Sequence, residues 1–406
     1  MTSQPLSRRS LVGGAAAAAL LGAAGSTHAR ADTRTGAQHQ AAEAAGAARI
    51  PPLRPDVLRA AIGDLTRPPA TAAQLRVTGT KGCWYGSAGV ADISTGRAVR
   101  PDDAFRAGSV TKVFVATVVL QMAGRSQVQL DAPIGRYLPG LLPREQARIT
   151  VAQLLHHTSG LPDHRGLPDL RTPEDVLHHR HDRWTPHQLV ATVTHGPLKF
   201  PPGTVQEYRG INYVLLALLI ERLSGRPYGE EIRRALLRPL GLTRTLLPGD
   251  DPRLHGSHVH GYLRMSDTSL RDITVYNPSS SWGEGELVSS VDDLSRFLEA
   301  LFRGLLLPRF MTEKLFTLPP ASVRMLDGSA ARYSMGLQKA TVNGVTFWGK
   351  TGEWYGCRTR MFSTRDHQRR FVLSYAPTPL SPREDMTDRV VAAFTQGAGG
   401  AAGDTA

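Results

Sequence analysis

Hydrophobic and polar residues alternate at both ends of the chain in a way that is typical of β-strands. Two such runs lie near residues 74–78 and 82–91. Four more follow after residue 330, over 333–340, 342–349, 355–363 and 370–376. Strands at both ends around a different middle segment imply that the two ends build one antiparallel sheet.

Helical spacing of apolar residues dominates that middle segment, from about 130 to 300. A helix over 56–65 and a C-terminal helix over 384–395 should flank the sheet. The run from Val110 to Met122 is β-branched enough for a strand, but its length and its end at Gly124 favour a helix buried on all sides. The predicted fold class is α/β (α+β): an antiparallel sheet flanked by helices, with an all-α inserted subdomain at about 130–300.

The N-terminal pattern indicates export. An Arg-Arg pair at 8–9 precedes an apolar run of small residues over 13–24, and Ala-Arg-Ala at 29–31 supplies a cleavage site. A membrane anchor is the alternative, but the run is shorter than the roughly 20 residues that span a bilayer. We therefore expect a twin-arginine signal peptide cleaved near Ala31 and a secreted protein without a permanent membrane anchor.

The net charge of the chain adds little to the prediction of its function. The chain has 406 residues and a formal net charge of +13. The basic residues are dispersed, which argues against nucleic acid. A bias toward arginine explains the charge, and attraction to an anionic cell wall is the functional alternative. The two cysteines, Cys83 and Cys357, are candidates for a disulfide that the sequence alone does not decide.

The positions of the few lysines indicate a candidate catalytic site. Only six of the 48 basic residues are lysines, and one of them ends the sequence Ser109-Val110-Thr111-Lys112. On a helix, residues three apart lie on one face, so Lys112 can activate the Ser109 hydroxyl as a nucleophile. Burial among apolar neighbours would lower the pKa of this lysine toward a proton acceptor. Alternatively, Ser109 only caps the helix and Lys112 reaches water.

A second lysine opens Lys350-Thr351-Gly352, about 240 residues later, with strand-like residues before it. Gly352 lets a substrate backbone approach, Thr351 offers a hydroxyl, and Lys350 offers a positive charge to a carboxylate. The backbone N–H of Glu353 can join that of Ser109 in an oxyanion hole. One substrate must touch both motifs, so Ser109 and Lys350 should lie within about 15 Å of each other. The alternative is an ordinary turn after a strand.

These motifs, with Tyr208 and Leu-Leu-His-His-Thr-Ser-Gly-Leu between them, resemble the secreted serine-type D-alanyl-D-alanine carboxypeptidases and the related class C β-lactamases. The resemblance covers roughly residues 55–395 in the family's order. It implies acylation of Ser109 by a D-Ala-D-Ala peptide or a β-lactam. It also implies Lys112 as proton acceptor and Tyr208 as proton relay or base, without deciding which of the two starts acylation. No cofactor or metal is expected, and we expect a monomer.

One position departs from the family pattern. The family has Tyr-x-Asn, in which the asparagine contacts the substrate amide and orients the lysine, but here Gly210 stands in its place. Asn212 would point elsewhere if the segment is helical. If substrate orientation limits the reaction, an asparagine at position 210 should raise peptidase activity.

Other candidates are weaker. Trp282 corresponds to an aromatic residue that lines the cleft in such enzymes, although tryptophans of this kind often belong to the core. A metal site at the histidines is the weaker interpretation: His156 and His157 belong to a structural motif, and His178, His179 and His181 are typical of a solvated helix face.

The domain prediction follows from these assignments. We expect a signal peptide over 1–31, a disordered spacer over 32–50, a serine β-lactamase-like catalytic domain over 51–396 and a disordered tail over 397–406. The leading functional hypothesis is D-alanyl-D-alanine carboxypeptidase activity on peptidoglycan stem peptides. A β-lactamase or small-ester hydrolase is the alternative on the same scaffold. A non-catalytic module that binds the cell wall or senses penicillin is the alternative of another class.

Overall fold

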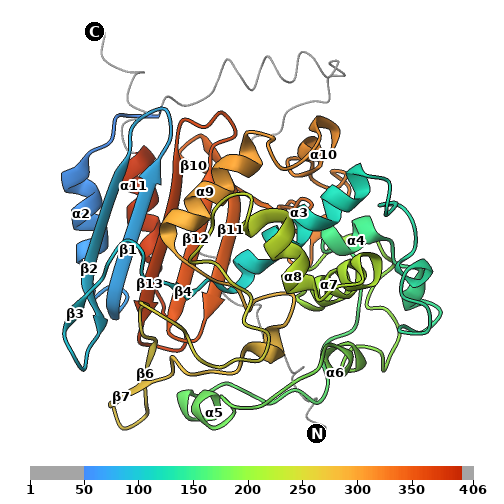
Figure 1. Cartoon of the computed structure of the whole chain (residues 1–406), viewed down its shortest axis with the longest axis horizontal. Helices are drawn as coiled ribbons and strands as arrows, with labels where there is room; N and C mark the ends of the chain where they lie inside the picture. Colours follow the sequence, from blue (N-terminus) through green and yellow to red (C-terminus); the bar gives the residue numbers. More distant parts are fainter. Residues whose placement is uncertain (1–49, 396–406) are drawn as a thin grey trace, which may run out of the picture.

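The computed structural model describes residues 50–395 as a sheet with a helical lobe beside it (Figure 1). The predicted signal peptide, nearly all of the spacer and the tail lie outside the described residues. Within residues 50–395, no helix is long and apolar enough to cross a membrane. Cys83 is exposed and Cys357 is buried, and the two thiols are not bonded to each other.

The predicted antiparallel sheet is present and has seven strands in the order β10-β11-β12-β13-β1-β2-β3. The two ends of the chain join where β1 pairs with β13, for example Leu75 with Leu373. The strands are β1 (Ala70–Thr78), β2 (Trp84–Asp92), β3 (Arg97–Ala98), β10 (Gln338–Val342), β11 (Val345–Trp354), β12 (Cys357–Ser363) and β13 (Arg370–Pro377).

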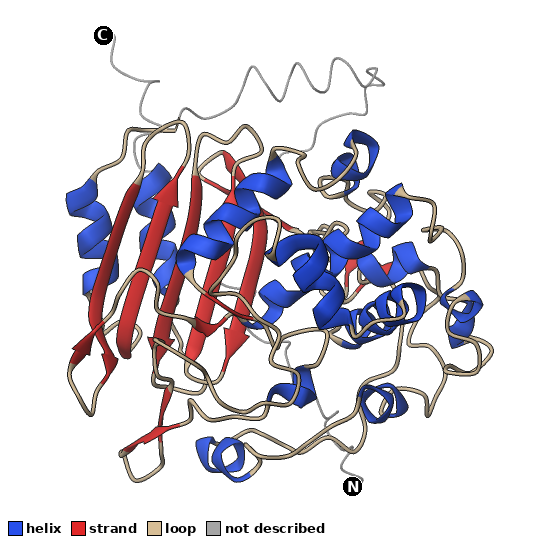
Figure 2. Ribbon diagram, viewed as in Figure 1, coloured by secondary structure: helices blue, strands red, loops and turns tan. Residues whose placement is uncertain are grey.

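Helices cover both faces of this sheet (Figure 2). The predicted flanking helices α2 (Pro55–Gly63) and α11 (Met386–Thr395) pack together on one face. Their apolar side chains share a core with the strands, formed by Leu58, Ile62, Leu75, Phe347, Phe371, Leu373 and Phe394. Helix α9 (Val291–Phe302) packs on β1, β12 and β13 and starts at Ser290, whose hydroxyl accepts a hydrogen bond from the backbone N–H of Asp293.

The helical lobe is built around α3 (Thr111–Gly124) and α7 (Ile211–Ser224), which pack on each other. Almost every residue of α3 is buried, as expected for a helix that is apolar on all sides. The other helices of the lobe are α4 (Val151–Leu155), α5 (Pro173–His178), α6 (Pro186–Ala191), α8 (Tyr228–Ile232) and α10 (Arg309–Lys314).

The inserted segment differs from the prediction in two respects. It is not wholly helical, because it contains short strands. In addition, α9 lies between the sheet and the lobe: it packs on β1, β12 and β13, and its Phe297 stacks on Phe114 of α3. The short strands of the chain are β4 (Phe105–Arg106), β5 (Val205–Gln206), β6 (Tyr262–Arg264), β7 (Leu270–Asp272), β8 (Val288–Ser289) and β9 (Arg324–Met325). Runs of two or three residues are too short to leave a periodic signal in the sequence.

The strand boundaries near the C-terminal half also differ. The run at 333–340 turns first, with Gly336 at φ +111°, and becomes a strand only at Gln338. Strand β11 continues through Lys350-Thr351-Gly352 to Trp354, because its backbone pairs with β12 along this stretch. The motif therefore lies within a strand and not in a turn after one.

Candidate active site

Ser109 lies in a single 3-10 turn, Gly108–Val110, that leads directly into α3. This turn packs against β11 so closely that glycine is required on both sides. A Cβ on Gly108, whose φ is +55°, would lie 2.6 Å from the backbone nitrogen of Glu353. A Cβ on Gly352 would overlap the carbonyl oxygen of Ala107. The backbone of Glu353 is thus held beside the serine turn, which is the arrangement expected for the oxyanion hole.

The side chain of Lys112 reaches back from the first turn of α3 to the serine. Its Nζ lies 3.1 Å from Ser109 Oγ, so the predicted i, i+3 pairing is present in the structure. The same Nζ donates to the backbone oxygen of Glu284 at 2.8 Å and to Glu284 Oε2 at 3.1 Å. Burial lowers the pKa of Lys112 below its usual value, and the Glu284 carboxylate opposes that shift. A lowered pKa makes the neutral amine, the form that can accept a proton, more accessible.

Tyr208 lies in the loop before α7, and its ring is enclosed by charged and aromatic groups. Lys112 Nζ is 5.1 Å and Lys350 Nζ 4.5 Å from the ring centroid, and the His157 ring is at 4.5 Å. Burial raises the pKa of Tyr208 well above its usual value, and the Ser109 hydroxyl is the side chain that counteracts this shift. The phenol is therefore neutral, which suits a group that passes a proton on.

Lys350 is almost fully buried, and its Nζ donates to the backbone oxygen of Thr351 at 3.0 Å. Burial is the main cause that holds the pKa of Lys350 well below its usual value, with a further contribution from Lys112. Lys112 Nζ, which lies beside Ser109 Oγ, and Lys350 Nζ both lie over the Tyr208 ring, so Ser109 and Lys350 are within the predicted distance of each other. However, Lys350 is not part of the cavity wall described below, and its Nζ faces the backbone oxygen of Thr351 and the Tyr208 ring.

The segment that carries Tyr208 is anchored by residues on both sides. His157 is buried with φ +59°, and its Nδ1 accepts a hydrogen bond from the backbone N–H of Arg209 at 3.1 Å. Burial lowers the pKa of His157 well below its usual value, so the ring is neutral. Asn212 Oδ1 accepts from Ser159 Oγ at 2.7 Å. Asn212 therefore faces this loop, as expected for a helical residue at that position.

A cavity of about 190 Å³ opens beside Ser109. Its wall combines acidic, basic and hydroxyl side chains with aromatic and aliphatic ones. The wall includes Ser109, Leu167, Leu170, Asp182, Trp184, Tyr276, Glu284, Glu353, Trp354, Tyr355, Arg358 and Leu380. Trp282 is placed elsewhere: it packs edge-on against Tyr228 at 4.6 Å, next to the main core.

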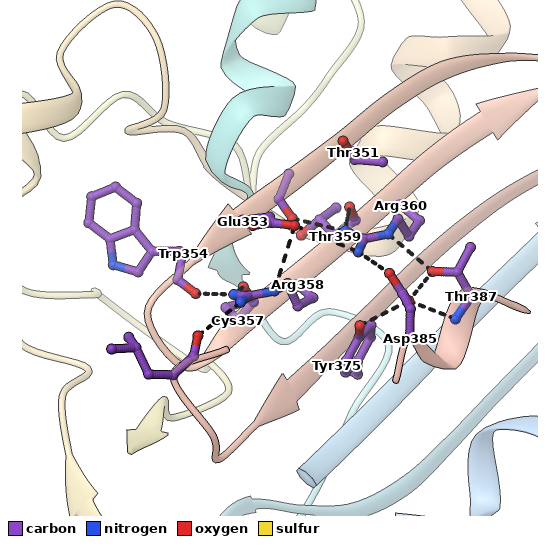
Figure 3. A network of polar contacts seen from close by, with 12 residues as sticks. Thr351, Glu353, Trp354, Cys357, Arg358, Thr359, Arg360, Tyr375, Asp385 and Thr387 are labelled. Atoms are coloured by element: carbon purple, nitrogen blue, oxygen red, sulfur yellow. Dashed lines mark hydrogen bonds and ion pairs between the residues drawn. The ribbon is translucent and has the colours of Figure 1, made fainter. Parts of the chain in front are cut away.

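Buried arginines hold the end of strand β11 in place (Figure 3). Arg360 on β12 donates to the backbone oxygen of Gly352 at 3.3 Å and pairs with Asp385. Arg358 donates to the backbone oxygen of Trp354 at 2.9 Å. Glu353 Oε1 lies 3.9 Å from both guanidinium groups. These contacts fix the strand that faces Ser109.

Sequence reasoning missed Glu284 and the aromatic wall. Glu284 lies 74 positions after Gly210, in a Ser-Trp-Gly-Glu-Gly sequence that attracted attention only for Trp282. Trp184, Tyr276 and Trp354 come from three separate parts of the chain. No spacing within the sequence links these residues; the lost asparagine at position 210 was the one signal that something else must contact Lys112.

Comparison with known proteins agrees with this geometry. A serine-lysine pair on a buried helix that faces a Lys-Thr-Gly strand defines the class of penicillin-recognising serine hydrolases. The chain belongs to the beta-lactamase family, whose model matches residues 58–405.

Among relatives, the chain is 25% identical over 319 residues to penicillin-binding protein 4* of Bacillus subtilis, covering 75% of this chain and 66% of that protein. It is 28% identical over 261 residues to esterase EstB of Burkholderia gladioli, covering 56% and 63%. The chain thus spans about half to two thirds of the length of the curated relatives it matches.

The similarity to one solved structure covers a larger part of the chain. The D-stereospecific amidohydrolase from Streptomyces sp. superposes with a TM-score of 0.73 at 29% identity, over 84% of this chain and 98% of that one. The fold is therefore the β-lactamase/transpeptidase-like fold that the resemblance implied.

Proposed function

We propose that this chain is a serine hydrolase that cleaves an amide bond through an acyl intermediate on Ser109. The observation that carries the proposal is the 3.1 Å contact between Lys112 Nζ and Ser109 Oγ at the wall of an open cavity. The lysine is buried and its pKa is lowered, so it can take the serine proton.

The reaction is written in two halves. In acylation, the Ser109 oxygen attacks the substrate carbonyl while its proton passes to Lys112, and the backbone N–H groups of Ser109 and Glu353 hold the developing oxyanion. The C–N bond then breaks, and the leaving amine receives the proton, which we propose that Tyr208 relays. In deacylation, water attacks the ester, releases the acid and returns the proton to Ser109.

The substrate we propose carries a D-amino acid on the acyl side of the scissile bond. D-Alanyl-D-alanine ends of peptidoglycan stem peptides are the substrate that the sequence motifs favour, and penicillin-binding relatives support this choice. The aromatic wall formed by Trp184, Tyr276, Trp354 and Tyr355 favours a second candidate. A wall of this kind suits a larger apolar side chain than the methyl group of alanine, as in D-stereospecific hydrolysis of peptides or amides.

We also propose that the protein is exported through its twin-arginine sequence, with cleavage near Ala31, and meets its substrate outside the cell. The support is the N-terminal pattern alone. Replacing Arg8 and Arg9 by lysines should retain the protein inside the cells. Release of the doubly substituted protein into the medium at the normal rate would contradict export by this route.

The activity is tested with the mature protein and a fluorescent penicillin. Covalent labelling that disappears in Ser109→Ala establishes the nucleophile. Stable label indicates peptidase behaviour and rapid turnover indicates a lactamase. Release of D-alanine from D-Ala-D-Ala peptides is then compared with hydrolysis of D-phenylalanine amide. A protein with no label and no turnover that binds cell wall in a salt-sensitive way would instead be a binding module.

A further inference from the structure

Gly210 occupies the position where the family has an asparagine, and the structure shows why no side chain fits there. A Cβ built on Gly210 would overlap both carboxylate oxygens of Glu284. Gly210 has an ordinary helical φ of −64° as the N-cap of α7, so backbone conformation does not demand glycine. Space demands it, because the side chain of Glu284 fills the volume that an asparagine would need.

Glu284 also makes the contact with the catalytic lysine that the asparagine makes in the family. Its Oε2 and its backbone oxygen lie 3.1 and 2.8 Å from Lys112 Nζ, the amine that faces Ser109. The loop that carries Glu284 is fixed: the Gly283 backbone N–H donates to Tyr228 Oη and Glu286 Oε1, both at 3.1 Å. The Glu284 side chain lines the same cavity as Ser109 and retains 17% exposure. It can therefore orient Lys112 and still meet a substrate.

The chemistry toward substrate is different from that of an amide. An asparagine side chain donates and accepts hydrogen bonds, whereas an ionised carboxylate only accepts. A substrate whose carbonyl oxygen faces Glu284 is repelled, and a substrate with an ammonium group there gains a charge-assisted hydrogen bond. The ammonium group closest to a scissile carbonyl is the free α-amino group of the acyl residue.

We infer that Glu284 replaces the missing asparagine, holding Lys112 toward Ser109 and selecting D-aminoacyl substrates with a free α-amino group over N-acylated ones. The inference rests on the proposed function and specifies a narrower class of substrates for it. It favours amino-terminal D-residues in short peptides or amides over the N-acylated end of a stem peptide.

The first test needs no variant. The mature protein is given D-phenylalanine p-nitroanilide and its N-acetyl counterpart, and kcat/KM is measured for each. A hydrogen bond to a charged group changes binding by about 10- to 100-fold, so the free amine should be preferred by at least that lower factor. Equal rates, or preference for the acetylated compound, would overturn the inference.

The second test replaces Glu284 by glutamine, which keeps the shape and adds an N–H donor. The preference for the free amine should then fall by at least about tenfold, with the acetylated substrate gaining relative to it. Asp182→Asn is the matched control, because it removes one negative charge from the same cavity wall without a contact to Lys112. A ratio that shifts equally in both variants would mean that overall charge, and not Glu284, sets the preference.

The third test separates positioning from selectivity. Gly210→Asn alone should lose activity because the new side chain displaces Glu284 from Lys112. Gly210→Asn combined with Glu284→Gly frees the space and should regain part of the activity, now toward the acetylated substrate. Failure of the pair to exceed the single variant would contradict the exchange of roles, provided that circular dichroism shows both to be folded.

These outcomes are distinct from failure of the proposed function. Hydrolysis of both compounds through Ser109 without any effect of Glu284→Gln leaves the serine hydrolase in place and overturns this inference alone. Absence of hydrolysis and of Ser109 labelling would overturn both.

Discussion

The Nζ atom of Lys350 lies 4.5 Å from the centroid of the Tyr208 ring, whereas Lys112 approaches the same ring at 5.1 Å. Two buried amines thus lie over one phenol ring, and each of them, when protonated, is attracted by the electron density of the ring face. The contact suggests that Lys350 positions Tyr208 as well as, or instead of, binding a substrate carboxylate.

Replacing Lys350 by methionine should therefore slow all substrates alike. We expect kcat to fall by about 100-fold, which is the usual contribution of a positioned proton-transfer group. The measurement compares a peptide that ends in a free carboxylate with the matching carboxamide. A loss restricted to KM of the carboxylate substrate would show that Lys350 binds that group directly.

The pH dependence of acylation should follow Lys112. Its pKa is lowered by burial and its neutral form accepts the proton, so the acylation rate should rise with pH and level off below the usual lysine pKa near 10.5. The Glu284 carboxylate raises this pKa, so Glu284→Gln should move the rising limb to lower pH. An uncharged ester such as p-nitrophenyl butyrate is the suitable substrate, because it has no amine that titrates. A limb that moves to higher pH would contradict the assignment.

The close contact between the serine turn and β11 should be disrupted by a single added methyl group at Gly352. In Gly352→Ala the added Cβ would overlap the carbonyl oxygen of Ala107 and push the strand away from Ser109. We expect activity to fall by about 100-fold, the scale of losing one oxyanion donor. Gly96→Ala serves as the steric control, since a Cβ there meets no atom within 4 Å, although its φ of +67° carries its own strain. Full activity in Gly352→Ala would show that the two segments adapt.

The buried pair of Arg360 and Asp385 should contribute to stability. Asp385→Asn removes the nearer of the two carboxylates beside the buried Arg360 guanidinium, leaving only Glu353 at 3.9 Å, and should lower the free energy of unfolding by about 3 kcal/mol. Burial raises the pKa of Asp385, but Arg360 and the hydrogen bonds from Thr387 outweigh it and lower this pKa from 3.8 to about 2. A depressed carboxyl pKa stabilises the fold above the unfolded value, so this contribution should be complete above about pH 4 and lost as pH falls toward 2.

Urea unfolding at neutral and acidic pH checks this prediction. The difference between the original chain and Asp385→Asn should shrink as the pH is lowered from 7 to 3. A difference that stays constant over this range would mean that the effect is one of packing and not of charge.

The sequence was informative wherever the signal is local. The apolar run before Gly124 and the strand patterns at both ends predicted the helix and the sheet, because periodicity reports which faces are buried. The Ser109 to Lys112 spacing predicted a contact that the helix itself enforces.

Contacts between residues that are far apart in the sequence could not be predicted. A side chain at position 210 and the side chain of Glu284 would occupy the same space, but neither position carries a local signature in the sequence. The same holds for the cavity wall, where Trp282 was the expected aromatic and Trp354 and Tyr355 are present instead. For Gly210, the sequence led us to expect that an asparagine would raise activity if substrate orientation limits the reaction; because a side chain there would overlap Glu284, we now expect it to lower activity.

The pairing of β1 with β13 has a consequence for the order in which the protein can fold. The first long strand of the sheet, Ala70–Thr78, has β13 as one of its two neighbours, almost 300 residues later in the chain. Strand β11, which packs against the serine turn, is likewise made late in synthesis. Contacts this distant along the chain form slowly. A growing chain therefore carries Ser109 for most of its synthesis without the strand that completes its surroundings, and the site is assembled only when the last strands arrive.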